Sequence, residues 1–210
     1  MTKKVISSVI SGIYVSLGAL TYLIIPNKMV GTMFFALGIL LVLNFNKRLV
    51  TRVTPLSTIS DEYNWVDILI ALGGNILGSI FTGLIVSFTR MVPKIQESII
   101  ELGNVKMNDS SISLLIMGIL CGIFVGYAVL LSKKYERGSF AQIFYVWLFV
   151  TAFVFCGFDH IVANAFYFSA YGFISSFSVA MIMPMIVVTI GNIIGGLLVG
   201  LIEKNNMKEE

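Results

Sequence analysis

Long apolar runs separated by short polar segments dominate the chain. Uninterrupted runs cover residues 5–25, 65–88, 112–131 and 179–202. With a rise of 1.5 Å per residue, a helix of about 20 residues crosses the roughly 30 Å hydrocarbon core of a bilayer. Each of these four runs is therefore expected to form a membrane-spanning helix.

Two further apolar runs are interrupted before they reach that length. One is apolar over residues 30–43 and then meets a polar stretch at 44–54. The other begins near Phe140, is interrupted at 157–164, and its apolar part resumes only over 165–168. Backbone that leaves the helix at membrane depth is tolerated only where it is buried in protein or lines a wet cavity. The pattern predicts six spanning segments, of which the second and fifth are broken.

The two halves of the chain resemble each other, and a polar connector with Pro93 and mixed charges, residues 89–111, is expected between them. Two glycine motifs recur in the same order: Gly12-Ile13-Tyr14-Val15 with Gly122-Ile123-Phe124-Val125, and Gly74-Asn75-Ile76-Leu77-Gly78 with Gly191-Asn192-Ile193-Ile194-Gly195. Small residues four apart let helix backbones approach closely, so Asn75 and Asn192 are expected to be structural and to bond across helices.

Each half contains three spans, an odd number, so the two repeats must be inverted. The predicted fold is one all-α integral membrane domain, residues 1–210, made of two inverted repeats at about 5–88 and 112–202. Broken helices paired in inverted repeats indicate a permeation site near the membrane midplane.

Composition agrees with a membrane protein. Hydrophobic residues make up 57% of the chain, charged residues 12%, and the mean hydropathy is +0.94, whereas a soluble domain carries about 25% charged residues. A net charge of +3, with no basic run longer than two residues, argues against nucleic acid as a partner. Cys121 and Cys156 both lie in apolar segments and are expected to be buried free thiols.

The distribution of lysine and arginine predicts the orientation. With six crossings and both termini on one side, that side carries ten basic residues and the opposite side four. The positive-inside rule then places both termini in the cytoplasm, in a cell membrane. The ten are Lys3, Lys4, Lys47, Arg48, Arg52, Lys133, Lys134, Arg137, Lys204 and Lys208; the four are Lys28, Arg90, Lys94 and Lys106.

The interruption at 157–164 contains the chain's single histidine, His160, beside Asp159. Ionisable groups inside a membrane are costly, so such a pair is by default a functional-site hypothesis. Histidine is the side chain whose unperturbed pKa, about 6.5, allows proton exchange near neutral pH. Alternatively, His160 makes only an interhelical hydrogen bond. Asp159 is expected to be structural, holding loop backbone or a basic partner.

Three motifs resemble those of the formate/nitrite transporter family, which are pentameric anion channels with an aquaporin-like protomer. They are Gly157-Phe158-Asp159-His160-Ile161-Val162-Ala163-Asn164, Gly191-Asn192-Ile193-Ile194-Gly195-Gly196 and Gly118-Ile119-Leu120-Cys121. The resemblance covers about residues 5–202. It implies a homopentamer in a lipid bilayer that passes small monovalent weak-acid anions of the formate, nitrite and hydrosulfide class together with protons, without a cofactor.

The resemblance also implies roles for individual residues. His160, Thr51 and Asn164 would form the central permeation site, and basic residues would attract anions from both sides. Apolar constrictions would exclude hydrated ions. The outer constriction matches Phe35, Ile39 and Phe153, the inner one Leu49, Val50 and Val125; the anion-attracting residues are Lys106 outside and Lys47, Arg48 and Arg52 inside.

Several positions depart from the family pattern and leave the identity of the permeant anion open. Asp159 replaces a glutamate, Gly122 an asparagine, Val50 a frequent phenylalanine and Ala165 a frequent methionine. The sequence starts at the first span, without the family's long N-terminal segment. Non-functional interpretations also remain open. The basic residues would then be only topology signals or solvated lysines, and Phe35 and Phe153 would serve helix packing or lipid contact.

Other classes of function are weaker. An aquaporin-like channel for neutral solutes would suit paired half-helices, but no Asn-Pro-Ala motif occurs. A non-transporting partner in a membrane assembly is a further alternative. One histidine and no clustered carboxylates supply too few ligands for a metal site and no nucleophile–base set, so no enzyme is expected.

Overall fold

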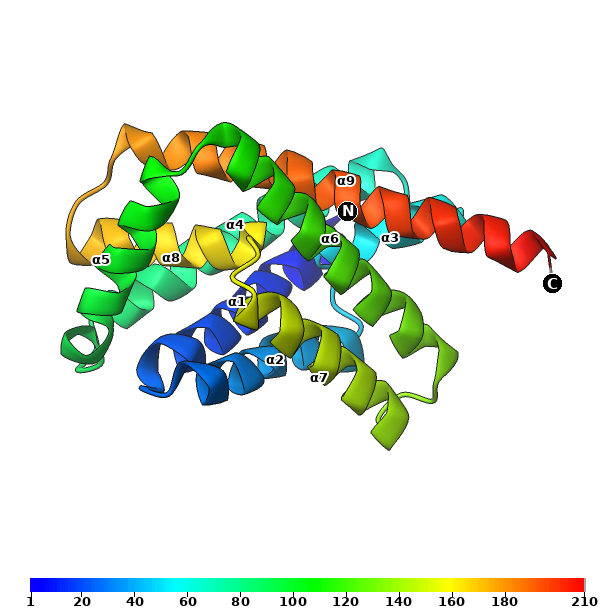
Figure 1. Ribbon diagram of the computed structural model, residues 1–210, viewed down its shortest axis with the longest axis horizontal. Coiled ribbons are helices and arrows are strands. Elements are labelled where there is room, and N and C mark those ends of the chain that lie inside the picture. Colours follow the sequence, from blue (N-terminus) through cyan, green and yellow to red (C-terminus); the bar gives the residue numbers. More distant parts are fainter. Residues whose placement is uncertain (210) are drawn as a thin grey trace.

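The computed structural model describes residues 1–209, with side chains through residue 206, and that part of the chain is all helical (Figure 1). It contains nine α-helices and one 3₁₀ turn: α1 (Thr2–Ile24), α2 (Lys28–Asn44), α3 (Val50–Ile59), α4 (Trp65–Ser87), α5 (Val92–Asn108), α6 (Ser111–Lys134), α7 (Phe140–Phe155), α8 (Ile161–Ile174), η1 (Val179–Met181) and α9 (Ile182–Glu209).

The four uninterrupted apolar runs are confirmed as long helices. By length and composition α1, α4, α6 and the continuous stretch Val179–Asn206 can cross a membrane. The other apolar helices, α2, α7 and α8, are shorter, at 17, 16 and 14 residues.

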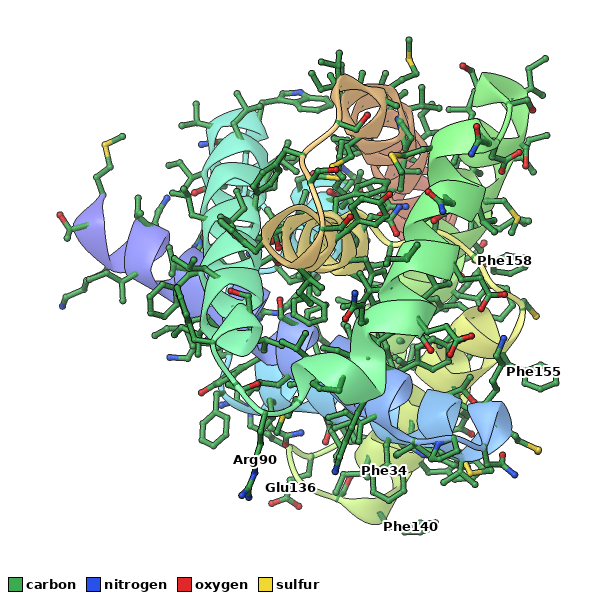
Figure 2. All side chains as sticks on the ribbon, turned by 90° about the vertical axis from the view of Figure 1, so that its left-hand side faces the viewer. Phe34, Arg90, Glu136, Phe140, Phe155 and Phe158 are labelled. Atoms are coloured by element: carbon green, nitrogen blue, oxygen red, sulfur yellow. The ribbon has the colours of Figure 1, made fainter. Side chains whose placement is uncertain are left out.

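Large apolar side chains cover the outside of the bundle. Phe34 is 47% exposed, Phe155 65% and Phe140 83%, and Figure 2 shows all three at the edge of the molecule. A monomeric soluble protein does not expose so much contiguous apolar surface. This surface is suited to lipid chains or to another apolar protein face.

Glycines allow the closest contacts between long helices, and they do so in the same way in both halves. A Cβ atom on Gly12 of α1 would collide with the carbonyl oxygen of Asn75 on α4. A Cβ atom on Gly122 of α6 would collide with the carbonyl oxygen of Asn192 on α9. The repeated Gly-Asn motifs therefore set the approach of α1 to α4 and of α6 to α9.

The short helices pack on the other half of the chain. α3, from the first half, lies against α9, where Gly196 and Gly200 face Pro55. α8, from the second half, lies against α4, where Gly83 faces Ser169. The two halves are therefore interlocked rather than placed side by side.

The polar connector predicted over residues 89–111 lies between α4 and α6, and most of it forms helix α5, which the hydropathy pattern did not indicate. Pro93 stands in the first turn, where a missing N–H costs nothing. Ile95, Ile99 and Gly103, spaced four apart, form its buried stripe, and the helix packs against α8. The charged face of this amphipathic helix conceals its apolar periodicity in a simple hydropathy profile.

The predicted limits of both interruptions are wrong, because helix resumes sooner. The chain leaves helical geometry only over residues 45–49 and 156–160, and α8 continues to Ile174 instead of fading after residue 168. Threonine hydroxyls bond to the preceding turn, as Thr54 does to the Val50 carbonyl at 2.7 Å, so this polar stretch is compatible with helix. Each interruption turns at one left-handed residue, Asn46 (φ 51°) or Gly157 (φ 75°).

Of the two cysteines expected to be buried, Cys121 is buried but Cys156 is exposed, and both are free thiols. Cys156 follows the last residue of α7, at the beginning of the second interruption. The apolar sequence around it therefore does not indicate burial.

Candidate permeation site

Asn75 of α4 fixes the interruption between α2 and α3 with three hydrogen bonds. Its side-chain oxygen accepts from the Val50 N–H at 2.8 Å. Its amide nitrogen donates to the Arg48 carbonyl at 2.9 Å and to the Ser8 carbonyl of α1 at 2.8 Å. One fully buried amide thus satisfies the backbone on both sides of Leu49, the N-cap of α3.

Asn192 of α9 makes the equivalent three bonds at the interruption between α7 and α8. Its oxygen accepts from the Ile161 N–H at 2.9 Å. Its nitrogen donates to the carbonyls of Asp159 at 2.7 Å and of Gly118 at 2.9 Å. His160 is the N-cap of α8 and lies between the two bonded backbone groups of Asp159 and Ile161.

The two interruptions bring Thr51 and His160 together. Thr51 lies in the first turn of α3, and its Oγ1 is 3.0 Å from His160 Nε2. Both side chains are buried, at 1% and 2% exposed. This pair, from positions far apart in the sequence, is the polar centre of an otherwise apolar region.

Hydrogen-bond geometry identifies the tautomer of a neutral His160. The backbone N–H of Ala163 donates to His160 Nδ1 at 3.4 Å, so Nδ1 carries no proton. The proton of the neutral ring is then on Nε2, which donates to Thr51 Oγ1. The free hydroxyl hydrogen of Thr51 remains available for another acceptor.

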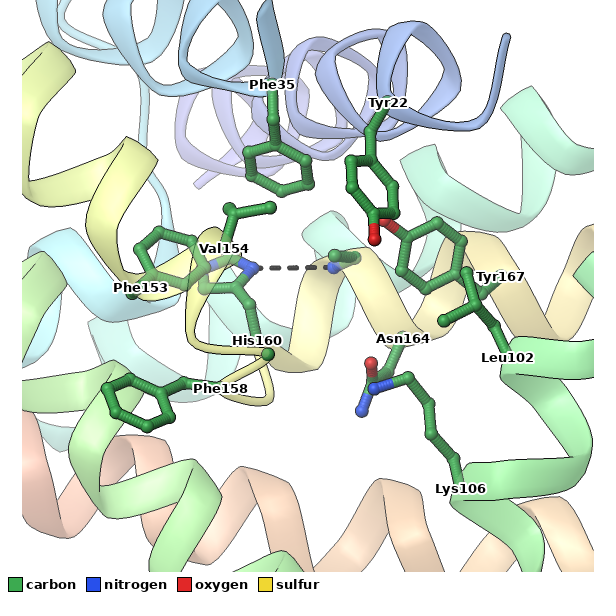
Figure 3. A pocket seen from close by; sticks show the side chains of 12 residues that line it. Tyr22, Phe35, Leu102, Lys106, Phe153, Val154, Phe158, His160, Asn164 and Tyr167 are labelled. Carbon is green, nitrogen blue, oxygen red and sulfur yellow. Dashed lines mark hydrogen bonds between the residues drawn. The ribbon is translucent and has the colours of Figure 1, made fainter. Parts of the chain in front are cut away.

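Asp159, Lys106 and Asn164 form one polar group beside His160. The Lys106 ammonium contacts the Asp159 carboxylate, and the Asn164 amide donates to the same carboxylate oxygen at 2.9 Å. Lys106 comes from α5, and Figure 3 shows it reaching towards Asn164. Its side chain is only 12% exposed, so it is not a solvated lysine.

Lys106, Asn164 and His160 border a cavity of about 70 Å³, which we name the Lys106 cavity. Its wall also includes Phe35 and Phe153, whose rings meet edge to face at 5.8 Å between centroids. The Phe153 ring lies 6.0 Å from the His160 ring (Figure 3). The chain thus places an aromatic pair directly against the histidine.

The other residues expected at constrictions are all fully buried. Ile39 lies one helical turn beyond Phe35 on α2. Leu49 and Val50 begin α3, and Val125 lies on α6; each of the four is 0% exposed. They belong to one apolar core that also contains Phe35 and Phe153.

The three basic residues expected on the inner side have different surroundings. Arg48 pairs with Asp67 at 2.6 Å and lies over the Tyr63 ring at 5.1 Å, and Asp67 also binds Lys4 at 2.6 Å. Lys47 is half-buried. Arg52 lines a cavity of about 410 Å³, named here the Arg52 cavity.

Sequence reasoning missed several of the residues around these basic groups. Lys133, Arg137, Tyr63 and Gln142 line the Arg52 cavity, and Asp67 anchors Arg48. A signal for Asp67 was present, since Asn64 and Asp67 form a capping box at the start of α4. Within the described residues no group of three potential metal ligands occurs.

Two solved channel structures have the same fold. An FNT family ion channel superposes with a TM-score of 0.88 at 23% sequence identity, covering 98% of this chain and 90% of that one. A pentameric formate channel with formate bound superposes with a TM-score of 0.86 at 21% identity, covering 100% and 98% of the two chains. At this identity the likeness concerns the fold alone.

Two curated proteins of Bacillus subtilis (strain 168) are similar in sequence, and both are described as uncharacterized transporters. YwcJ is 28% identical over 141 residues, which cover 64% of this chain and 54% of YwcJ. YrhG is 30% identical over 189 residues, covering 84% of this chain and 70% of YrhG. The chain therefore spans about half the length of YwcJ.

The family model described as formate/nitrite transporter matches residues 1–203, which confirms the resemblance seen in the motifs. A transporter family and several apolar helices make this a multi-pass membrane protein and not an enzyme. On the strength of that match along nearly its whole length, the chain belongs to the formate/nitrite transporter family.

Proposed function

We propose that the protein is a channel for small monovalent weak-acid anions of the formate, nitrite and hydrosulfide class, and that a proton crosses with each anion. The observation that supports it most directly is the buried Thr51–His160 pair at 3.0 Å, which is packed against an apolar core. Membership of the family and the likeness in fold to a formate channel support this choice.

In this proposal the chain crosses the membrane six times as two inverted repeats. α2 with α3, and α7 with α8, are the two broken helices. The matching bonds of Asn75 and Asn192 support this arrangement, because both amides hold the residues that flank the N-cap of the resumed helix. Five copies would assemble in the cell membrane, with both termini in the cytoplasm.

Electrostatics favours a neutral permeating species. An isolated anion in a medium of low dielectric constant costs many kcal/mol, whereas its conjugate acid costs far less. The anion would take one proton from water in the entry cavity, cross the apolar core as the neutral acid, and release that proton on the far side. Constrictions at Phe35, Ile39 and Phe153 and at Leu49, Val50 and Val125 would exclude hydrated ions.

His160 would act as a hydrogen-bond donor in the neutral form described above. Because the Nε2–H donates to Thr51 Oγ1, the Thr51 hydroxyl keeps its own hydrogen and a second lone pair, and so offers one donor and one acceptor to an acid in transit. A protonated Nδ1 would confront the Ala163 N–H that now donates to it, so the site opposes a charged imidazole. Lys106 is joined to Asp159 and Asn164. Its main role would be to orient an anion that has already arrived, and its long-range attraction for the anion would be small.

Flux in proteoliposomes tests the proposal. Formate, nitrite and hydrosulfide should permeate faster as the pH is lowered, while chloride, the anion of a strong acid, should not permeate. His160→Phe should abolish weak-acid flux. Permeation of water without any weak acid would instead indicate the aquaporin-like alternative, and absence of all flux would favour an assembly partner.

A further inference from the structure

The Lys106 cavity and the Arg52 cavity lie at opposite ends of the same helices. On α2, Phe35 borders the first and Leu43 the second, eight residues or about 12 Å apart. On α7, Phe153 borders the first and Gln142 the second, about 16 Å apart. The buried Ile39 and Val150 lie between these positions, so apolar core separates the cavities.

The charge in the Lys106 cavity is compensated within the protein. Lys106 is the charged residue of its wall, and its ammonium contacts the Asp159 carboxylate, whose side chain is 4% exposed. A cation and an anion in contact leave little net field at the distance of an approaching ion. An anion gains little long-range attraction at this end.

The Arg52 cavity differs because, across the described residues, no carboxylate contacts its buried cation. Arg52 is 8% exposed. Its guanidinium donates to the Lys47 carbonyl at 2.9 Å and to the Asn46 side-chain oxygen, which are both neutral. Across the described part of the chain, no carboxylate lies within 4.0 Å of it. Burying a cation in this way is costly unless an anion is near.

The remaining charges of the same cavity leave it positive. Lys133 and Arg137 line it together with Arg52, and Glu62 is the one acidic residue of its lining. The volume of about 410 Å³ is ample for a small hydrated anion. A concave surface with an excess of one charge concentrates ions of the opposite sign.

We propose that the two ends of the channel bind the permeant anion with unequal affinity, and that the Arg52 cavity holds carboxylate-class and similar small oxyanions more tightly than the Lys106 cavity does. This inference rests on the proposed channel function. The Arg52 end binds more tightly because no described carboxylate contacts Arg52, whereas Asp159 contacts Lys106.

Unequal binding has a defined kinetic consequence in a passive channel. At equal pH and zero voltage, the flux per unit concentration at low concentration must be the same in both directions. Formate entering from the Arg52 end therefore reaches half-saturation at a lower concentration and has a proportionally lower maximum rate. We expect a difference of about fivefold to tenfold, and a tenfold difference corresponds to about 1.4 kcal/mol.

The test is formate flux from each side of uniformly oriented channels, with equal pH on both sides. Arg52→Gln should raise the half-saturating concentration at the Arg52 end to that of the other end. Lys134→Gln is the matched control, because it removes the same charge from the residue beside Lys133 but does not line the cavity. Symmetric saturation in the unmodified channel, with normal flux, would overturn the inference and leave the channel function intact.

Arg52 also holds the interruption through Lys47 and Asn46, so its substitution could prevent folding. The double variant Lys133→Gln/Arg137→Gln changes only exposed side chains of the cavity and should raise the half-saturating concentration at that end by about twofold to threefold, part of the expected difference. If Arg52→Gln does not fold, an unchanged half-saturating concentration in the double variant would contradict the inference.

Thermal unfolding in detergent gives a readout that needs no flux. Formate at fixed ionic strength should raise the midpoint temperature of the unmodified protein relative to chloride, since a ligand that binds only the folded state stabilises it. This shift should shrink in the double variant. If the shift is present and specific but no flux occurs, the binding site stands and the proposed channel function fails.

Discussion

At the scale of single residues, the hydrogen bond between Thr51 and His160 joins two chain segments inside an apolar core. Both side chains are buried, so Thr51 Oγ1 and His160 Nε2 depend on each other for their hydrogen bond. The arrangement gives one orientation of the ring, because Ala163 occupies Nδ1 and Thr51 occupies Nε2. Removing either contact should therefore change transport and not only stability.

Thr51→Val keeps the shape of the side chain but removes the oxygen that accepts from His160. We expect weak-acid flux in proteoliposomes to fall by about tenfold, equivalent to about 1.4 kcal/mol, because a buried donor is left without a partner. Thr51→Ser should restore most of the flux. Thr54→Val is the control, since that hydroxyl bonds only to the Val50 carbonyl of its own helix.

Asp67→Asn should destabilise the protein by about 3 kcal/mol, because Arg48 would lose its buried carboxylate partner. The measurement is the midpoint of thermal unfolding in detergent. Asp61→Asn, at an exposed position of the loop before α4, serves as the control and should be near neutral. Equal midpoints for the two variants would show that the Arg48–Asp67 pair contributes no stability.

Sequence motifs and family spacing identified His160 and its expected partner Thr51, and the structure brings them together. The motifs and the family spacing did not identify Asp67 as the ion-pair partner of Arg48 or Asp159 as that of Lys106. A buried ion pair such as Arg48–Asp67 depends on which helices become neighbours, and no local pattern records that. Arg52 could be recognised as basic, but the absence of a contacting carboxylate among the described residues is visible only once the surrounding helices are placed.

At the scale of elements, two glycine–asparagine motifs determine how the long helices meet and where the short helices begin. Asn75 and Asn192 were expected to bond across helices, and each does so while also holding one interruption. The long helices could be predicted because apolar length is a local property. Helix α5 and the limits of the interruptions could not, because they depend on a partner surface and on side-chain caps.

Gly122→Ala should lower the midpoint of thermal unfolding, at a cost of about 1–3 kcal/mol, because the new Cβ would lie 2.5 Å from the Asn192 carbonyl oxygen. Gly73→Ala in α4 is the matched substitution at an open position, with nothing within 4 Å of the new atom. It should be neutral, or stabilising by up to about 1 kcal/mol through helix propensity. A comparable loss in both variants would mean that close packing is not the cause.

At the scale of the whole molecule, the proposed orientation places the α3–α4 loop inside the cell and the end of α5 outside. Asp61→Cys and Asn108→Cys are exposed positions suited to this question. In whole cells a membrane-impermeant maleimide should label Asn108→Cys and should spare Asp61→Cys until the cells are opened. The exposed Cys156 requires a Cys156→Ser background in both variants. The reverse labelling pattern would invert the proposed topology.

The packing of α3 on α9 and of α8 on α4 has a consequence for biogenesis. Before α9 has been synthesised, α3 lacks its main packing partner, and Pro55 is without the glycine face of α9 that it contacts in the folded protein. The first half of the nascent chain must therefore wait in the membrane in an open form, available to chaperones and proteases. The packed structure forms only after α9 has been synthesised. A substitution in α9 can therefore change the folding or degradation of the first half of the chain, which is synthesised earlier.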